Sequence, residues 1–262
     1  MGRVLPRRRA GPRQNGWRLS TRPRIFAIMS NDMHEGWKMN IDRATLAAAA
    51  PYLVWMVLLL ALPAQPAFYA LRTLCAAILL VPALGFLIRS PRTDFGEEPP
   101  RAGPVLLWGT LTGLAVFLLW VAPEAWGWYR EWFILGDLPA ADAPAPYDPA
   151  NCGWPLTLAR LAGSAFVIAP AEELFFRGFL YRRLQAKDWT HVPPRRFDAS
   201  AFLWTVGLFA LEHNRWLAGA LAGALYGWVA LRKGLWAAIL AHVATNLVLA
   251  LYVIKFDEWA FW

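Results

Sequence analysis

The sequence predicts an all-α fold in which about seven helices each cross a lipid bilayer. Hydrophobic residues make up 58% of the 262 positions and charged residues only 17%, whereas a soluble domain carries about a quarter charged residues. Several stretches of roughly twenty residues hold almost no charge, and that length suits a hydrocarbon core of about 30 Å. Only two cysteines occur, so neither a disulfide framework nor a cysteine-based metal cluster is indicated. We therefore expect a multi-pass membrane protein.

Seven apolar runs account for the expected spans, and an acidic, turn-rich loop interrupts them between Pro123 and Gly153. The runs are Ala44–Leu62, Phe68–Ile88, Val105–Ala122, Trp154–Ala171, Ala199–Glu212, Trp216–Leu231 and Leu235–Ile254. The fifth and sixth are short, because a rise of about 1.5 Å per residue gives them only roughly 21 to 24 Å. These two helices must tilt, thin the bilayer or rest on their neighbours. The alternative is an eighth, partly inserted helix within the acidic loop.

Composition divides the chain into four parts. Residues 1–43 are arginine-rich with little apolar content, which is typical of a basic tail. Residues 44–153 hold the first three spans, with Arg72 as their only charge, and the acidic loop. Residues 154–254 hold the other four spans with most of the ionisable residues at membrane depth, and 255–262 form a short C-terminal tail. The second group of helices is therefore expected to carry the functional site, with the first as scaffold.

Basic residues between the runs predict the orientation, because Lys and Arg accumulate on the cytoplasmic side of a membrane. With the N-terminus inside, the inside segments hold 20 of the 26 basic residues and the outside segments three. The acidic loop then lies outside, where four aromatic residues are suited to anchor it at the interface: Trp126, Trp128, Tyr129 and Trp132. The net charge of +8 follows from this placement and does not indicate nucleic-acid binding.

Two adjacent glutamates form the first polar cluster within the spans. Ionisable residues at membrane depth are costly and are usually functional or paired. Glu173 and Arg177 are four residues apart and share a helix face, so Glu173 has a partner on its own helix. Glu172 has only apolar residues at helical spacing, so its carboxylate must find a partner on another helix and is suited to act as a general base. In the simpler interpretation, all three residues end the helix at the cytoplasmic surface.

Two histidines and an asparagine form further clusters on neighbouring helices. Phe209 lies near the end of the fifth run, and His213 directly follows that run. His242 and Asn246 lie four residues apart on the last run. That spacing can present two hydrogen-bond donors to one developing oxyanion. A single helical histidine or asparagine is more often a packing residue, but their occurrence beside two glutamates supports a common site.

Two further features concern the backbone. Pro170 cannot donate a hydrogen bond, so it is expected to free a carbonyl one turn earlier, near Phe166. Gly219, Gly223 and Gly227 recur at every fourth position, a spacing that allows helices to approach closely. The glycine stripe is expected to draw together the two helices that carry the histidines.

In their order and spacing these residues resemble the signature of the CPBP family, the CAAX prenyl protease and bacteriocin-processing family of intramembrane endopeptidases. The family pattern is EExxxR, then FxxxH, then HxxxN or HxxxD. The matching residues are Glu172, Glu173, Arg177, Phe209, His213, His242 and Asn246. The resemblance covers roughly residues 154–254, and residues 212–216 also resemble the subgroup associated with bacterial exosortase protein-sorting systems.

The resemblance implies a membrane-embedded protease whose substrate is a membrane-anchored protein or peptide, of the CAAX type or with a C-terminal sorting signal. Glu172 with His213 would activate water, and His242 and Asn246 would stabilise the oxyanion. Glu173, Arg177 and Phe209 would support the site, without a cofactor. A bacterial inner membrane would be the location. The family usually has eight membrane helices rather than seven. In addition, Glu172 is expected near the inner end of its helix and His213 near the outer end of a short helix. The two residues would then differ in depth within the membrane.

Other functions stay open at this point. His213, His242 and a glutamate could bind zinc, although the HExxH pattern of many zinc proteases is absent. A membrane scaffold of the same fold is a non-enzymatic alternative. A proton-coupled transporter is less well supported, because no internal repeat is visible. Serine and aspartyl intramembrane chemistry lack their motifs, since there is no GxSG sequence and no pair of aspartates on the spans.

Overall fold

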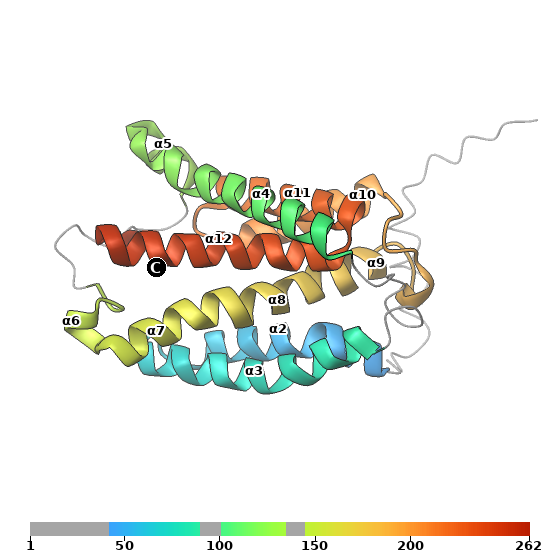
Figure 1. Cartoon of the computed structure of the whole chain (residues 1–262), viewed down its shortest axis with the longest axis horizontal. Coiled ribbons are helices and arrows are strands. Elements are labelled where there is room, and N and C mark those ends of the chain that lie inside the picture. Colours follow the sequence, from blue (N-terminus) through green and yellow to red (C-terminus); the bar gives the residue numbers. More distant parts are fainter. Residues whose placement is uncertain (1–41, 90–100, 135–144) are drawn as a thin grey trace, which may run out of the picture. The chain divides into compact units, whose positions relative to one another are not determined.

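The computed structural model describes residues 42–89, 101–134 and 145–262, and this part of the chain contains helices and no strand, as predicted (Figure 1). The expected basic tail lies outside the described residues except for its last two positions. The same is true of residues 135–144 in the acidic loop.

Three long apolar helices form the first group. Helix α2 (Arg43–Ala61) begins at Asp42, whose carboxylate accepts a hydrogen bond from the backbone N–H of Thr45 at 2.7 Å. Helix α3 (Pro66–Arg89) packs along α2, whereas α4 (Ala102–Val121) packs against the last helix of the chain. These bounds lie within three residues of the first three predicted runs.

A single helical segment runs without interruption from Trp154 to Arg183. It comprises α7 (Trp154–Gly163), a π-helical stretch (Ser164–Ile168), α8 (Ala169–Glu173), a second π-helical stretch (Leu174–Leu180) and α9 (Tyr181–Arg183). The expected end at Ala171 was therefore wrong. The helix continues because Glu173 and Arg177 pair with each other, so their charges do not have to reach water. Before Pro170 the backbone departs from the α-helix over five residues.

Helices α10 (Ala199–Leu211), α11 (Trp216–Lys233) and α12 (Leu235–Phe256) complete the second group. The glycine stripe of α11 packs against α10 and the turn that follows it: Gly219 lies against His213, Gly223 against Phe209 and Gly227 against Phe202. The expectation that the stripe also draws in the His242 helix was thus only half right. Helix α12 instead contacts another face of α11 and packs closely on α4.

The segment 154–183 lies between the α2–α3 pair and α12 (Figure 1). Helix α3 contacts its first part, α2 contacts its second part, and α12 lies along the opposite side. Helix α11 contacts α4, α10 and α12. The polar residues of the second group therefore face inward, toward a region enclosed by several helices.

Four helices of the described chain are long and apolar enough to cross a membrane: Arg43–Ala61, Pro66–Ile88, Ala102–Ala125 and Leu235–Phe256. Their outer faces expose large apolar side chains, such as Leu60 at 84% and Val81 at 71%, as a lipid-facing surface does. Helix α10 has only 13 residues, so the count of seven spans stays a prediction. In the acidic loop, α5 (Gly127–Phe133) is too short to cross alone, and α6 (Pro149–Cys152) is a single turn.

The aromatic anchor predicted for the acidic loop is only partly as expected. Trp126, Trp128 and Trp132 are exposed, as interfacial residues should be. Tyr129 is buried, against expectation, and packs beside Phe133 of the same short helix.

Candidate active site

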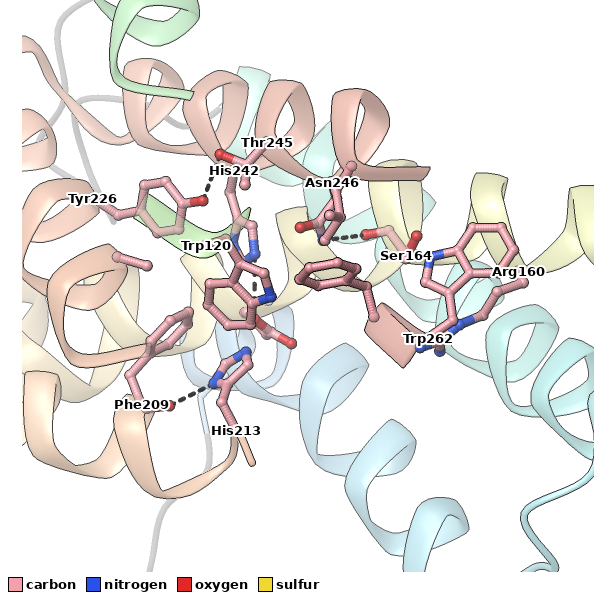
Figure 2. Close-up of a pocket in the computed structure, with 14 residues that line it drawn as sticks. Trp120, Arg160, Ser164, Phe209, His213, Tyr226, His242, Thr245, Asn246 and Trp262 are labelled. Atoms are coloured by element: carbon pink, nitrogen blue, oxygen red, sulfur yellow. Dashed lines mark hydrogen bonds and ion pairs between the residues drawn. The ribbon is translucent and has the colours of Figure 1, made fainter. Parts of the chain in front are cut away.

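A cavity of about 150 Å³ lies among α4, α7, α8, α10, α11 and α12 (Figure 2). All four expected catalytic residues line it, together with Phe209. Glu173 and Arg177 do not line the cavity but contact residues that do. Its full lining is Trp120, Arg160, Ser164, Glu172, Phe209, His213, Ala222, Tyr226, His242, Thr245, Asn246, Leu249, Phe261 and Trp262. Residues from five separate predicted runs thus meet in one place.

Glu173 joins two helices behind the cavity wall. Its side chain is fully buried, and Oε1 accepts a hydrogen bond from Arg177 Nη1 at 3.0 Å and lies 2.9 Å from His242 Nδ1. Arg177 is further held by Gly223, whose carbonyl accepts from Nη2 at 2.8 Å. The pairing with Arg177 confirms the sequence prediction, whereas the contact with His242 was not anticipated. Because a carboxylate accepts hydrogen bonds, Glu173 fixes a proton on Nδ1 and turns Nε2 of His242 toward the cavity.

Glu172 has no close partner. Its Oε2 lies 3.7 Å from His242 Nε2, which is too far for a hydrogen bond, and this buried oxygen has no hydrogen-bond partner. A separation of this size between two polar atoms is suited to a bridging water. As predicted, the group nearest to this carboxylate that could compensate its charge, the imidazole ring of His242, comes from another helix. A second carboxylate, Glu212, lies nearby directly after the end of α10 and accepts a hydrogen bond from Tyr52.

His213 enters the cavity from the end of α10. Its Nδ1 lies 2.8 Å from the carbonyl oxygen of Phe209 and therefore carries the proton, which leaves Nε2 of the neutral ring as an acceptor. The ring packs on Phe209 at 4.8 Å and on Trp120 at 5.3 Å between centroids. The expected mismatch in depth between Glu172 and His213 does not arise. Glu172 lies near the middle of the segment 154–183 instead of at its end.

Asn246 connects the site to the disturbed backbone before Pro170. Its Nδ2 donates to the carbonyl oxygen of Ser164 at 2.9 Å, and the same oxygen accepts from the N–H of Ala169 in the π-helical stretch (Figure 2). Asn246 and His242 both line the cavity, as their spacing predicted. One amide hydrogen of Asn246 is thus used by Ser164, and the other is available for a ligand.

Several cavity residues were not identified from the sequence. Tyr226 stacks on His242 with ring centroids 4.6 Å apart, and its hydroxyl group donates to Thr245 Oγ1 at 2.7 Å. Thr245 Oγ1 lies 2.9 Å from the carbonyl oxygen of Gly113 on α4. Trp120 and Arg160 complete the walls. Aromatic residues are too frequent in this chain for Tyr226 or Trp120 to stand out, but Arg160 is one of few charges within a span.

The fit of a metal ion can be judged from the donor atoms. Among the described residues, no group of three or more His, Cys, Asp and Glu side chains is arranged to hold one. Nδ1 of His213 is engaged with a backbone carbonyl and Nδ1 of His242 with Glu173, which leaves Nε2 of both rings available, as in many metal sites. The zinc alternative of two histidines and a glutamate therefore stays a hypothesis.

The fold and the site define a class first: a helical membrane protein that brings a carboxylate, two histidines and an amide together around one cavity. Residues 154–248 match the family model for Type II CAAX prenyl endopeptidase Rce1-like proteins. The match covers less than half of the chain, and it makes this segment similar to the CPBP family of intramembrane peptidases. The matched segment contains all seven candidate residues. Searches of curated proteins and of solved structures gave no match.

Proposed function

We propose that the protein hydrolyses a peptide bond in a membrane-anchored protein or peptide, with Glu172 as the general base. One observation carries this proposal. Glu172 presents an oxygen atom without a hydrogen-bond partner to a cavity that two histidines and an asparagine also line. A carboxylate placed in this way can take a proton from water, and a group that merely stabilised the fold would be paired.

The other residues have distinct roles in this reaction. Water held by Glu172 and by Nε2 of His213 attacks the carbonyl carbon of the substrate, and its proton moves to Glu172. The oxyanion that forms accepts hydrogen bonds from His242, protonated on Nε2, and from the free amide hydrogen of Asn246. Glu173 stabilises the charged His242 ring. The peptide C–N bond then breaks as Glu172 passes its proton to the leaving amine, which yields a carboxylic acid and an amine.

The substrate belongs to the class that a membrane-embedded cavity can reach, namely proteins anchored in or attached to the bilayer. A CAAX-type substrate and a bacterial protein with a C-terminal sorting signal both belong to this class. Association with an exosortase sorting system in a bacterial inner membrane rests only on the resemblance of residues 212–216. The orientation that we propose places the N-terminus in the cytoplasm.

The test is processing of membrane-protein substrates in cells that express the wild type, Glu172→Gln or His242→Ala at matched levels. We expect a defined cleavage product with the wild type and its loss with both variants. Glu258→Gln is the matched control, because Glu258 is an exposed glutamate outside the cavity and its loss should not affect cleavage. An unchanged product in the Glu172→Gln cells contradicts the proposal, and a wild type that cleaves nothing favours the scaffold function.

The same assay tests whether hydrolysis needs a metal ion. We propose a hydrolysis that needs no cofactor, so purified protein should keep its activity after exhaustive chelation and dialysis. Loss of activity on chelation and its return with zinc alone would establish the zinc-dependent mechanism instead.

A further inference from the structure

We propose that Tyr226 is a positioning residue for His242: its aromatic ring keeps the imidazole plane aimed into the cavity, and Thr245 keeps Tyr226 in place. The proposal rests on the proposed function and adds to it a residue that lies outside the sequence motifs. Three observations carry it: the stacking of the two rings, the hydrogen bonds that hold the Tyr226 hydroxyl group, and the burial of all three side chains.

The rings of Tyr226 and His242 lie nearly parallel (Figure 2). Their centroids are 4.6 Å apart and their planes differ by 23°. Tyr226 comes from α11, where it lines the cavity together with Ala222, one turn earlier. Tyr226 is only 1% exposed and His242 only 5%. The two rings therefore form a buried contact between α11 and α12 at the wall of the cavity.

Two contacts of different direction then hold the His242 ring. Oε1 of Glu173 lies 2.9 Å from Nδ1 at the edge of the ring and fixes the proton on that nitrogen. An edge contact of this kind leaves the ring able to tilt about the line of the hydrogen bond. The face of Tyr226 opposes this tilt, because the two stacked rings would have to separate. Nε2, which donates to the oxyanion in the proposed reaction, therefore keeps one direction.

The Tyr226 ring also suits the positive charge that His242 carries in the proposed reaction. The face of an aromatic ring is negative and attracts a cation within about 6 Å of its centroid. The guanidinium carbon of Arg177 lies farther from this ring, at 5.7 Å, and Arg177 is already paired with Glu173. Because the attraction is strongest for a charged imidazole, it favours formation of the oxyanion over binding of the substrate.

The hydroxyl group of Tyr226 is held by two further helices. It donates to Thr245 Oγ1 of α12 at 2.7 Å. The Thr245 proton therefore points to a carbonyl oxygen, that of Gly113 at 2.9 Å or that of Ala241 at 3.0 Å. Gly113 belongs to α4, which approaches α12 so closely that a side chain there would collide with it. The support of His242 thus extends from α11 through α12 to a helix of the first group.

The hydroxyl group is not suited to act on the substrate itself. A tyrosine has a single hydroxyl proton, and that of Tyr226 is used by Thr245. It cannot stabilise an oxyanion without breaking this hydrogen bond. The aromatic ring is therefore the part of Tyr226 that acts on His242, and the hydroxyl group serves to hold the ring.

The first test compares cleavage of a dye-labelled, lipid-anchored peptide by the wild type and its variants in phosphatidylcholine vesicles. Tyr226→Leu removes the ring, so kcat should fall by about thirtyfold while KM changes by less than about twofold. Tyr226→Phe keeps the ring and loses only its anchor, so kcat should fall by about threefold to tenfold. Tyr252→Phe is the matched control, because it removes a tyrosine hydroxyl group of α12 outside the cavity lining and should leave kcat unchanged.

The second test follows His242 without hydrolysis. Glu172→Gln protein with isotope-labelled histidine is placed in phosphatidylcholine bilayers, and solid-state NMR measures the order parameter S² of the imidazole C–H bonds. The Glu172→Gln/His242→Gln protein identifies the signal of His242. We expect S² of about 0.85 in Glu172→Gln and Glu172→Gln/Tyr226→Phe, and a value below about 0.6 in Glu172→Gln/Tyr226→Leu.

Three results overturn the proposal. The first is a fall in kcat that is as large in Tyr226→Phe as in Tyr226→Leu, because the hydroxyl group would then be the acting part. The second is an S² of His242 that does not change when the ring is removed. The third, which holds even if Tyr226→Leu does not fold, is that Tyr226→Phe lowers kcat as much in a Thr245→Val protein as in the wild type, since both changes break one hydrogen bond. Failure of the proposed function is distinguishable, because the wild type would then cleave no peptide while S² still depends on Tyr226.

Discussion

Glu173 shows how a single buried carboxylate can organise the candidate site without lining it. It accepts the guanidinium group of Arg177 from its own helix and faces the imidazole ring of His242 from α12. Removing one partner of such a buried group is costly, because the other charge is left without compensation. Glu173 is therefore a positioning residue, whereas Glu172 is expected to contact the substrate.

We predict that Glu173→Gln lowers both activity and stability. The amide keeps the shape of the side chain but leaves Arg177 unpaired, which costs about 3 kcal/mol for a buried pair. His242 also loses the group that fixes its proton on Nδ1, so cleavage should fall by at least about a hundredfold. Thermal unfolding in detergent and the cleavage rate at saturating substrate measure the two effects.

A double variant separates these roles. Glu173→Gln/Arg177→Met removes both charges, so it should recover part of the lost stability without recovering activity. Full activity in the Glu173→Gln protein would show that His242 does not depend on this carboxylate.

At the scale of helices, the spacing of residues correctly predicted contacts within one helix, but it did not predict where a helix ends or which helices pack together. The separation of four residues correctly paired Glu173 with Arg177, but the same charges were expected near the end of the helix. The local sequence shows that Glu173 and Arg177 are charged. It does not show that their pairing lets both charges stay buried, so that the helix can continue past them. The glycines are a second case, because the stripe on α11 was recognised while Gly109 and Gly113 of α4 were not, although they lie against α12.

Gly113→Ala should disturb the contact of α4 with α12. A Cβ atom there would lie 2.6 Å from the carbonyl oxygen of Ala241 and 2.7 Å from Cβ of Ala244, so the helices must separate. Overpacking of this kind costs about 1–3 kcal/mol. Activity should fall as well, because Thr245, which contacts the Gly113 carbonyl, lies on α12 beside the site.

Gly103→Ala is the control on the same helix, since nothing lies within 4 Å of a Cβ atom at that position. It makes the same chemical change with no clash and should leave thermal unfolding and cleavage unaffected or raise stability slightly. If both variants behave alike, close approach at Gly113 is not what holds α4 on α12.

For the whole molecule, the all-α class could be predicted from the apolar runs, and the similarity of residues 154–248 to a peptidase family could be predicted from the ordered polar motifs. The first and last predicted runs agree with α2 and α12 to within two residues. The walls of the cavity could not be predicted, because Trp120, Tyr226 and Arg160 meet only through packing of helices distant in sequence. Nor could the number of spans be predicted, because the 13 residues of α10 are too few for its length to decide whether it crosses the bilayer.

The position of the C-terminus decides this last question. If α10 crosses, seven spans place Trp262 on the side opposite the N-terminus, as the distribution of basic residues predicts. At 13 residues α10 covers only about 20 Å. If it enters and returns on the same side, six spans remain and both ends lie in the cytoplasm. We predict that a reporter fused after Trp262 is active only outside, and that one inserted between Arg183 and Asp198 is active only inside. A cytoplasmic reporter at Trp262, together with an inside reporter between Arg183 and Asp198, would show that α10 does not cross, whereas an outside reporter between Arg183 and Asp198 would indicate an eighth span in the acidic loop.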